Sequence, residues 1–245
     1  MTAIPHGRTG RTGPVAATCV LAVAGAVLLA GCGGDDPDAG TNGVGKLPPA
    51  KIQAKTRAAA DAASAVRLSG TVVTSGLTYT LDMRLKAGGS TGSVTSKAGT
   101  FRLLRVGSEL YLKADADFWH HSGDTSAAGK LDGKYVKVPQ GDPAYKKFSG
   151  FTDKSLLLNG LLTLHGKLAA DSRHEQSGTR TIRVTGDNGS GGTLDVSLEG
   201  TPYPLRLVRA GSAGTLTFSD WGKDFPAAEP AKADTVDYGR QLPSS

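Results

Sequence analysis

Cysteine is nearly absent from this chain, whose 245 residues contain only Cys19 and Cys32. Both lie near the N-terminus, so the sequence predicts no disulfide, thiol catalysis or cysteine-based metal site in the remainder of the chain. Aromatic residues make up only 6% of the chain, whereas glycine is abundant, with 34 residues. This composition favours short strands joined by many turns and stabilised by an apolar core.

Charge of one sign is not concentrated in any segment. The formal net charge is +6, but the 28 Lys and Arg residues are spread along the chain. Nucleic-acid-binding proteins typically gather their basic residues into a patch or stripe. The sequence therefore predicts no nucleic-acid partner, whereas the modest positive charge slightly favours an anionic membrane surface.

Motifs of nucleophilic and nucleotide-using enzymes are also missing. Ser155, His165 and Asp171 contain the atoms of a catalytic triad, but no Gly-x-Ser-x-Gly elbow surrounds the serine. No glycine-rich phosphate loop follows a strand and opens a helix. We therefore expect neither enzymatic activity nor a cofactor.

A metal site is not predicted either. The pair His120-His121 lies close to Asp115 and Asp117, but adjacent histidines project in different directions and no further ligand has characteristic spacing. A surface loop is the favoured interpretation. The neighbouring Phe118-Trp119 either anchors the chain at a membrane or pocket mouth or packs beneath a loop, and the sequence leaves both open.

One long apolar run is present, and it lies at the N-terminus. Residues Val15 to Cys32 read VAATCVLAVAGAVLLAGC and follow Arg8 and Arg11. A basic segment, an apolar run and small residues before a cleavage site are typical of an export signal. A transmembrane helix needs roughly 20 apolar residues, whereas this run is shorter and the polar stretch Gly33–Asp38 follows at once.

The end of this run, Leu29-Ala30-Gly31-Cys32, resembles the lipobox of bacterial lipoproteins. In such proteins the cysteine sulfur is diacylated and the signal is then removed. The resemblance implies that residues 1–31 are a signal peptide and that Cys32 carries a diacylglyceryl anchor. The mature protein would then be held on the extracytoplasmic face of the cell membrane.

Composition divides the remainder of the chain into three parts. Residues 32–50 are rich in Gly, Asp, Asn and Pro, which predicts a disordered tether. Residues 51–222 alternate apolar and polar side chains and form the predicted domain. Residues 223–245 have little to bury, which predicts a disordered or loosely packed tail.

Within the domain, residues 50–66 are predicted to be a helix with a narrow apolar stripe. Strict alternation between residues 77 and 85 predicts a half-buried antiparallel strand with one wet face. A longer irregular excursion is expected over residues 117–133, and a loop with a possible short helix over 139–154. The predicted strands cover residues 67–75, 77–86, 93–97, 100–106, 109–114, 134–138, 179–186, 193–199, 204–209 and 214–219.

The stretch from Ser155 to Leu168 contains seven leucines and favours a buried helix, although Gly160 and Gly166 weaken that prediction. Helices and one-sided strands bury their apolar surfaces most simply in an α+β fold. We therefore predict a single curved antiparallel sheet with helices packed on one face.

Several sequence segments together resemble those of the LppX/LprG lipoprotein family of actinobacteria. Besides the lipobox and an Ala-rich helix, they are Ser69-Gly70-Thr71, the segment Arg105–Lys113, Phe118-Trp119 and the segment Gly133–Val138. Members of that family are similar to the lipoprotein carriers LolA and LolB. The resemblance implies a half-barrel whose concave face is capped by helices, and an apolar cavity that holds acylated lipid or glycolipid.

Apolar side chains of two strands and of the leucine-rich segment are the candidate walls of such a cavity. They are Leu81, Met83, Leu85, Leu157, Leu161, Leu194, Val196 and Leu198. The same residues would equally fill a solid core, and the sequence does not separate the two arrangements.

Two functions remain open. The first is a membrane-anchored carrier that binds acylated lipid or glycolipid and exchanges it with an envelope transporter. The second is a non-enzymatic sensor or scaffold lipoprotein with a solid core, which binds a protein or cell-wall partner through its outer face.

Overall fold

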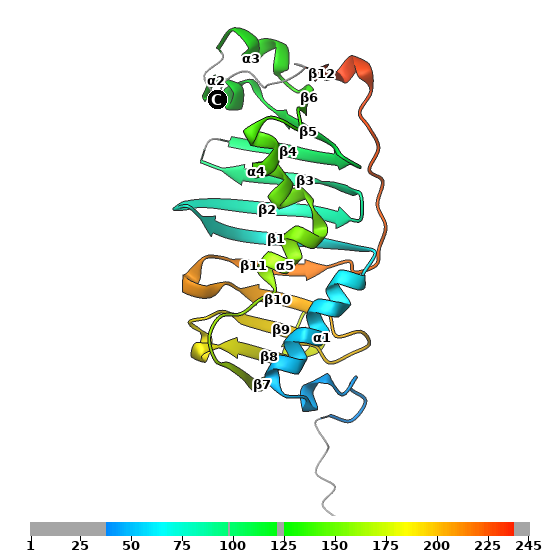
Figure 1. The fold of residues 1–245 in the computed structure, drawn as a ribbon, viewed down its shortest axis with the longest axis vertical. Coiled ribbons are helices and arrows are strands. Elements are labelled where there is room, and N and C mark those ends of the chain that lie inside the picture. Colours follow the sequence, from blue (N-terminus) through cyan, green and yellow to red (C-terminus); the bar gives the residue numbers. More distant parts are fainter. Residues whose placement is uncertain (1–37, 98, 122–124, 238–245) are drawn as a thin grey trace, which may run out of the picture. The chain divides into compact units, whose positions relative to one another are not determined.

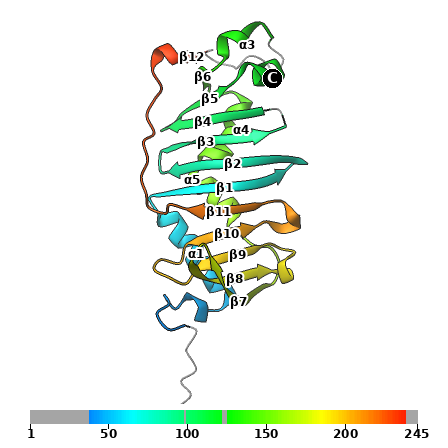
Figure 2. The same cartoon turned by 180° about the vertical axis from the view of Figure 1, so that it is seen from behind.

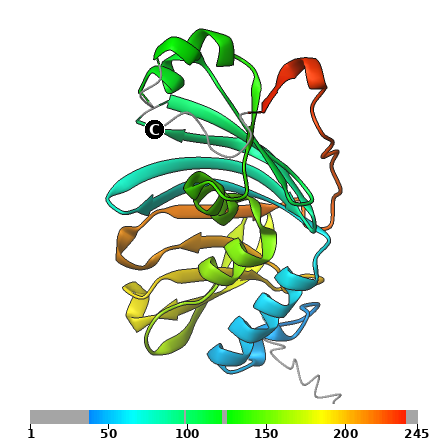
Figure 3. The ribbon, with the colours of Figure 1, turned by 45° about the horizontal axis from the view of Figure 1, so that its top comes forward.

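The computed structural model describes residues 38–97, 99–121 and 125–237. All strands of this part join one curved sheet that does not close, as Figure 3 shows. Neighbouring strands run antiparallel except for the terminal pair β12–β6, which is parallel. The predicted α+β half-barrel with helices on the concave face is therefore confirmed.

The order of strands across the sheet is β12-β6-β5-β4-β3-β2-β1-β11-β10-β9-β8-β7. The pairing of β1 with β11 joins the first run of strands to the second. The strands are β1 (Ala65–Thr74), β2 (Leu77–Lys86), β3 (Gly89–Ser96), β4 (Gly99–Val106), β5 (Glu109–Ala114), β6 (Tyr135–Val138), β7 (Leu168–Gln176), β8 (Thr179–Gly186), β9 (Thr193–Ser197), β10 (Pro204–Val208), β11 (Thr215–Ser219) and β12 (Thr235–Asp237).

Three helices lie side by side over the concave face: α1 (Pro49–Ala62), α4 (Pro143–Thr152) and α5 (Lys154–Leu161). Helix α1 contacts β7, β8 and β10, whereas α4 contacts β2, β3 and β4, and α5 lies between them (Figure 1). Helices α2 (Ala116–His121) and α3 (Thr125–Leu131) pack together near the β5–β6 end. None of the described helices is both long and apolar enough to span a membrane.

Local sequence accounts for the boundaries of α4 and α5. Asp142 caps α4 by accepting a hydrogen bond from the amide of Ala144, at 2.7 Å. Asp153 caps α5 by accepting from the amide of Leu156, at 2.9 Å. Each carboxylate satisfies an N-terminal amide that has no partner inside its helix. The loop expected over residues 139–154 is therefore mostly helix, and α2 and α3 replace the expected excursion over 117–133.

The leucine-rich segment differs from its prediction. Helix α5 ends at Leu161, and strand β7 begins at Leu168. Gly166 adopts a φ of 78°, a backbone conformation that favours glycine and that lies outside a right-handed helix. The following strand was not predicted because it lies at the sheet edge and most of its side chains are exposed, so no apolar alternation marks it.

Parts of both predicted flanks contact the domain. Residues 38–47 pack on the β8–β9 end, where the Asn42 amide donates to the carbonyl of Leu198 at 2.8 Å and Val44 is buried. The segment after β11 runs along the strand ends to β12, at the side of the sheet in Figures 1 and 2. Phe225 in this segment is only 4% exposed. The predicted signal peptide, Cys32 and residues 238–245 lie outside the described residues.

Candidate functional site

An apolar layer lies between the concave face of the sheet and helices α1, α4 and α5. Alternation along β2 points Leu81, Met83 and Leu85 into this layer, and each is at most 1% exposed. At the other end of the sheet, Leu194 and Val196 of β9 point into it and are fully buried. All five residues belong to one apolar cluster.

The residues predicted on β2 and β9 are not in neighbouring strands. Strands β1, β11 and β10 lie between them, which separates the two sets by roughly 19 Å at the usual strand spacing. Strand register nevertheless joins them in one apolar row across the concave face. From β8 to β4, this row consists of Val184, Leu194, Leu207, Leu216, Gly70, Leu81, Val94 and Phe101.

The middle of this row was missed by sequence reasoning. Leu207 on β10 and Leu216 on β11 are at most 1% exposed and belong to the same cluster as Leu81 and Leu194. Their strands alternate apolar and polar residues, so their burial was detectable. Their position between β2 and β9 depends on the pairing of β1 with β11, which local sequence does not encode.

Helix residues cover this row from the other side. Of the predicted leucines, Leu161 is 8% exposed, whereas Leu157 is only partly buried against the cluster. Leu158 and Leu162 are more deeply buried, at 3% and 2%, and Ile52 of α1 is fully buried. Leu198 follows β9 directly and is also fully buried.

The layer is tightly packed around the predicted strand residues. A side chain that lined an open, water-sized space would retain exposed area, but the six predicted strand residues retain at most 1%. Two buried hydroxyl groups on this side of the sheet, Thr56 of α1 and Ser90 of β3, have no hydrogen-bond partner among the described residues. An unsatisfied buried hydroxyl carries a free-energy cost of about 1–3 kcal/mol.

Lys154 fastens α5 to the C-terminal end of α1. Its ammonium Nζ donates to the carbonyl oxygens of Ala60, Asp61 and Ala63 at 3.2, 2.7 and 2.8 Å. These carbonyls have no partner inside the helix, and a cation there interacts favourably with the helix dipole. Burial lowers the pKa of Lys154, while the Asp61 carboxylate acts in the opposite direction.

An ion pair joins the α4–α5 corner to the sheet. The Arg105 guanidinium of β4 donates to Asp153 at 3.0 Å. The pKa of Asp153 is lowered, first by the hydrogen bond from the Leu156 amide and then by Arg105. The Tyr145 hydroxyl of α4 also donates to the Ser108 carbonyl at 2.7 Å. Polar contacts therefore fasten the helices at their ends, and apolar contacts hold their inner faces.

The other sequence candidates are dispersed. Ser155, His165 and Asp171 lie in α5, in the segment after it and in β7, and Ser155 Oγ lies 3.5 Å from Asp61 Oδ1. His120 is exposed on α2, whereas the side chain of His121 is outside the described part of the chain. No group of three metal-ligating side chains occurs in the described part of the chain.

The dipeptide Phe118-Trp119 is packed. Trp119 is 4% exposed, and its ring meets the Phe118 ring edge to face with centroids 5.3 Å apart. The Phe118 ring also contacts Phe101 of β4, with centroids 5.3 Å apart. Of the two readings left open by the sequence, the structure supports packing.

Several known structures align with this chain. LprF from Mycobacterium bovis aligns with a TM-score of 0.53 and 17% identity, covering 75% of this chain and 97% of LprF. Lipoprotein LppX from Mycobacterium tuberculosis aligns with a TM-score of 0.45 and 15% identity, covering 72% of this chain and 98% of LppX. An uncharacterized conserved protein from Thermus thermophilus gives a TM-score of 0.37 and 10% identity, covering 77% of this chain and 98% of that protein.

At 17% identity, the likeness to LprF shows the fold alone. It confirms the architecture that the resemblance to the LppX/LprG lipoproteins implied. No protein-family model and no curated protein sequence matches the chain.

Proposed function

We propose that this chain is a lipid-anchored extracytoplasmic protein that binds acylated lipid or glycolipid between the concave face of its sheet and helices α1, α4 and α5. The observation that carries the proposal is the apolar row from Val184 to Phe101, which crosses the sheet beneath these helices. Acyl chains lying along this row would contact the predicted residues of both β2 and β9. No covalent chemistry is required.

In this proposal a lipid enters when α1 and α5 part from each other and move away from the sheet, because the layer is tightly packed around the predicted strand residues. Each methylene removed from water contributes about 0.8 kcal/mol, so one chain of about 16 carbons contributes roughly 12 kcal/mol before opposing costs. Separating the helices exposes their inner faces and breaks the contacts of Lys154 and Asp153. The gain from two or three chains is of the size needed to offset that cost.

Thr56 supplies a polar group that would fix a lipid within the layer. Its buried hydroxyl lacks a partner among the described residues, and an ester carbonyl of an acylated lipid is a suitable acceptor. Binding sites for apolar ligands commonly combine apolar walls with a few polar groups that set orientation. In this proposal the lipid removes the cost of the unsatisfied hydroxyl.

Membrane attachment belongs to the same proposal. Two acyl chains on Cys32 would hold the protein firmly, since a single chain gives only marginal membrane binding. Residues 38–47 of the predicted tether pack on the domain. An envelope transporter that loads or unloads the lipid would be the partner.

The alternative is a sensor or scaffold lipoprotein whose layer remains a solid core. The near-zero exposure of Leu81, Met83 and Leu194 favours this alternative. In that case the outer surface would bind a protein or cell-wall partner, and no lipid would enter between helices and sheet.

Lipid content separates the two functions. The full chain is purified from its host membranes in a mild detergent, and native mass spectrometry compares it before and after organic extraction. A carrier is expected to lose a near-stoichiometric diacyl or triacyl lipid on extraction and to keep only the covalent anchor. If extraction leaves the mass unchanged, and incubation with host lipids does not increase it, the scaffold function is favoured.

A cross-link tests whether the helices must separate. Cysteines in place of Asp61 and Ser155, whose oxygens lie 3.5 Å apart, are expected to form a disulfide between α1 and α5. The oxidised Asp61→Cys/Ser155→Cys variant should exchange lipid much more slowly than the reduced form, with Ser155→Cys as the control. Equal exchange by both forms would place the entry route elsewhere.

A further inference from the structure

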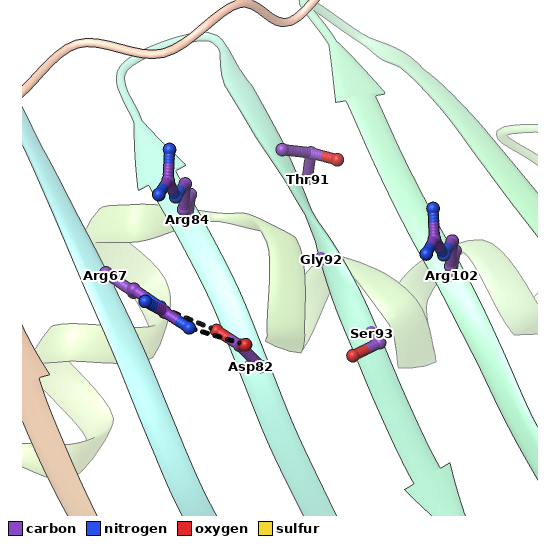
Figure 4. Close-up of a pocket in the computed structure, with 7 residues that line it drawn as sticks. All are labelled: Arg67, Asp82, Arg84, Thr91, Gly92, Ser93 and Arg102. Carbon is purple, nitrogen blue, oxygen red and sulfur yellow. Dashed lines mark hydrogen bonds and ion pairs between the residues drawn. The ribbon is translucent and has the colours of Figure 1, made fainter.

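The convex face of the sheet carries a depression that apolar ligands would not occupy. It has a volume of about 320 Å³ and is lined by Arg67, Asp82, Arg84, Thr91, Gly92, Ser93 and Arg102. Figure 4 views it with the helices behind the sheet, so these side chains lie on the face opposite the apolar layer. Their neighbours in sequence, Leu68, Met83 and Leu103, are fully buried on the helix side.

The shape of the depression follows from side-chain size along three adjacent strands. Strand β3 contributes only Thr91, Gly92 and Ser93, while β2 and β4 contribute Arg84 and Arg102. The long arginine side chains rise on either side of short ones, and Figure 4 shows both pointing the same way from the sheet. The result is a trough with a floor of hydroxyl groups and backbone.

Strand register brings like charges together around this trough. Arg67 lies directly opposite Arg84 across the β1–β2 pair, and Arg102 lies opposite Lys113 across β4–β5. Like charges directly opposite each other in a sheet are destabilising. A local excess of positive charge is therefore built into the fold, although the sequence shows no cluster of basic residues.

The carboxylates nearby do not neutralise this excess. Asp82 accepts two hydrogen bonds from Arg67, at 2.9 and 2.8 Å, and these bonds lower the pKa of Asp82. Asp220 lies near Arg67 and Arg84, but it forms its own ion pair with Lys223 at 2.8 Å. Among the described residues, neither Arg84 nor Arg102 forms an ion pair.

We propose that this trough binds a phosphate-type oxyanion, with the Arg84 and Arg102 guanidinium groups on either side and the Thr91 and Ser93 hydroxyls beneath. A guanidinium group donates two parallel hydrogen bonds to a phosphate, and this is among the strongest polar contacts in proteins. The volume lies at the lower end of the range for small-ligand sites. The phosphate could be free or could belong to a lipid headgroup, and both present the same oxygens.

The test removes both charges and keeps a polar side chain at each position. The full chain and its Arg84→Gln/Arg102→Gln variant are titrated by calorimetry in maltoside micelles at constant ionic strength. The probes are inorganic phosphate, and micelles that contain either phosphatidylglycerol or phosphatidylcholine. Lys51→Gln/Lys55→Gln is the matched control, because it removes the same charge from exposed positions on α1.

The full chain and the control are expected to bind phosphate or phosphatidylglycerol saturably, and the arginine variant at least about tenfold more weakly. Saturation by phosphate alone identifies the free anion, whereas saturation by phosphatidylglycerol alone identifies the headgroup. Equal binding by the arginine variant, or no saturable binding of either probe, would overturn the proposal. Arg84 and Arg102 are exposed and lie opposite like charges, so the arginine variant should unfold at no lower a temperature than the control. The outcome is independent of the lipid content of the apolar layer.

Discussion

Lys154 offers the most direct test of how the helices are held over the sheet. Lys154→Met keeps most of the apolar stem and removes the ammonium that bonds to the carbonyls of Ala60, Asp61 and Ala63. A hydrogen bond to a charged group contributes about 1.5–3 kcal/mol net. Three such bonds would give roughly 4–9 kcal/mol, but burial of the ammonium opposes them by several kcal/mol.

Part of the lost hydrogen-bond energy is recovered in the variant, because Asp61 lies at the surface and water can bond to its carbonyl. We therefore expect Lys154→Met to lower the free energy of unfolding by about 3 kcal/mol. For a domain of this size that corresponds to a fall in Tm of roughly 6–12 °C.

The assay is thermal unfolding of the full chain in maltoside micelles, followed by far-ultraviolet circular dichroism. Lys55→Met is the control, because it removes the same charge from an exposed position on α1, the helix that Lys154 contacts. If Lys154→Met and Lys55→Met unfold within about 1 °C of each other, the reasoning is refuted. The cost of burying the ammonium would then equal the strength of its hydrogen bonds.

Three further outcomes follow from other parts of the molecule. Thr56→Val removes an unsatisfied buried hydroxyl, so it should raise the free energy of unfolding by about 1 kcal/mol. If the protein is a carrier, the variant should also co-purify with less lipid. Unchanged lipid content would exclude Thr56 from lipid binding. The folded pKa of Asp153 lies below its ordinary value, so its stabilisation is complete above about pH 4 and is lost as the pH falls through the folded pKa. Asp153→Asn should therefore flatten the acid side of a plot of Tm against pH, and a plot parallel to that of the unsubstituted chain would contradict this role. Cys32→Ala should release the protein from membranes on fractionation, and continued membrane association would contradict the lipid anchor.

Local sequence was sufficient for most strands of the sheet. The predicted limits of β2, β5 and β8 agree with the structure, because alternation of apolar and polar residues directly reports a strand with one buried face. The burial of Leu81, Met83 and Leu85 follows from the same alternation. Strand β7 was missed because an exposed edge strand buries too little to leave a pattern.

The contacts that depend on distant parts of the chain were beyond local sequence. Local sequence does not distinguish Lys154 from the other lysines. Folding places it at the C-terminal end of α1, which lies more than 90 residues earlier in the chain. Phe225 likewise becomes buried only because its segment runs along the strand ends. In both cases, the residue is stabilised by a contact with a distant segment, and sequence periodicity does not identify that segment.

The sequence by itself determined which residues turn toward the apolar layer, because the two faces of a strand alternate along the chain. Only the tertiary structure decided which of those residues meet. The pairing of β1 with β11 joins Leu81 and Leu194 in one apolar row, and the register of β1 with β2 sets Arg67 opposite Arg84 on the other face. Strand order and register are properties of the whole sheet, since each arises from hydrogen bonds between segments that are separate in sequence.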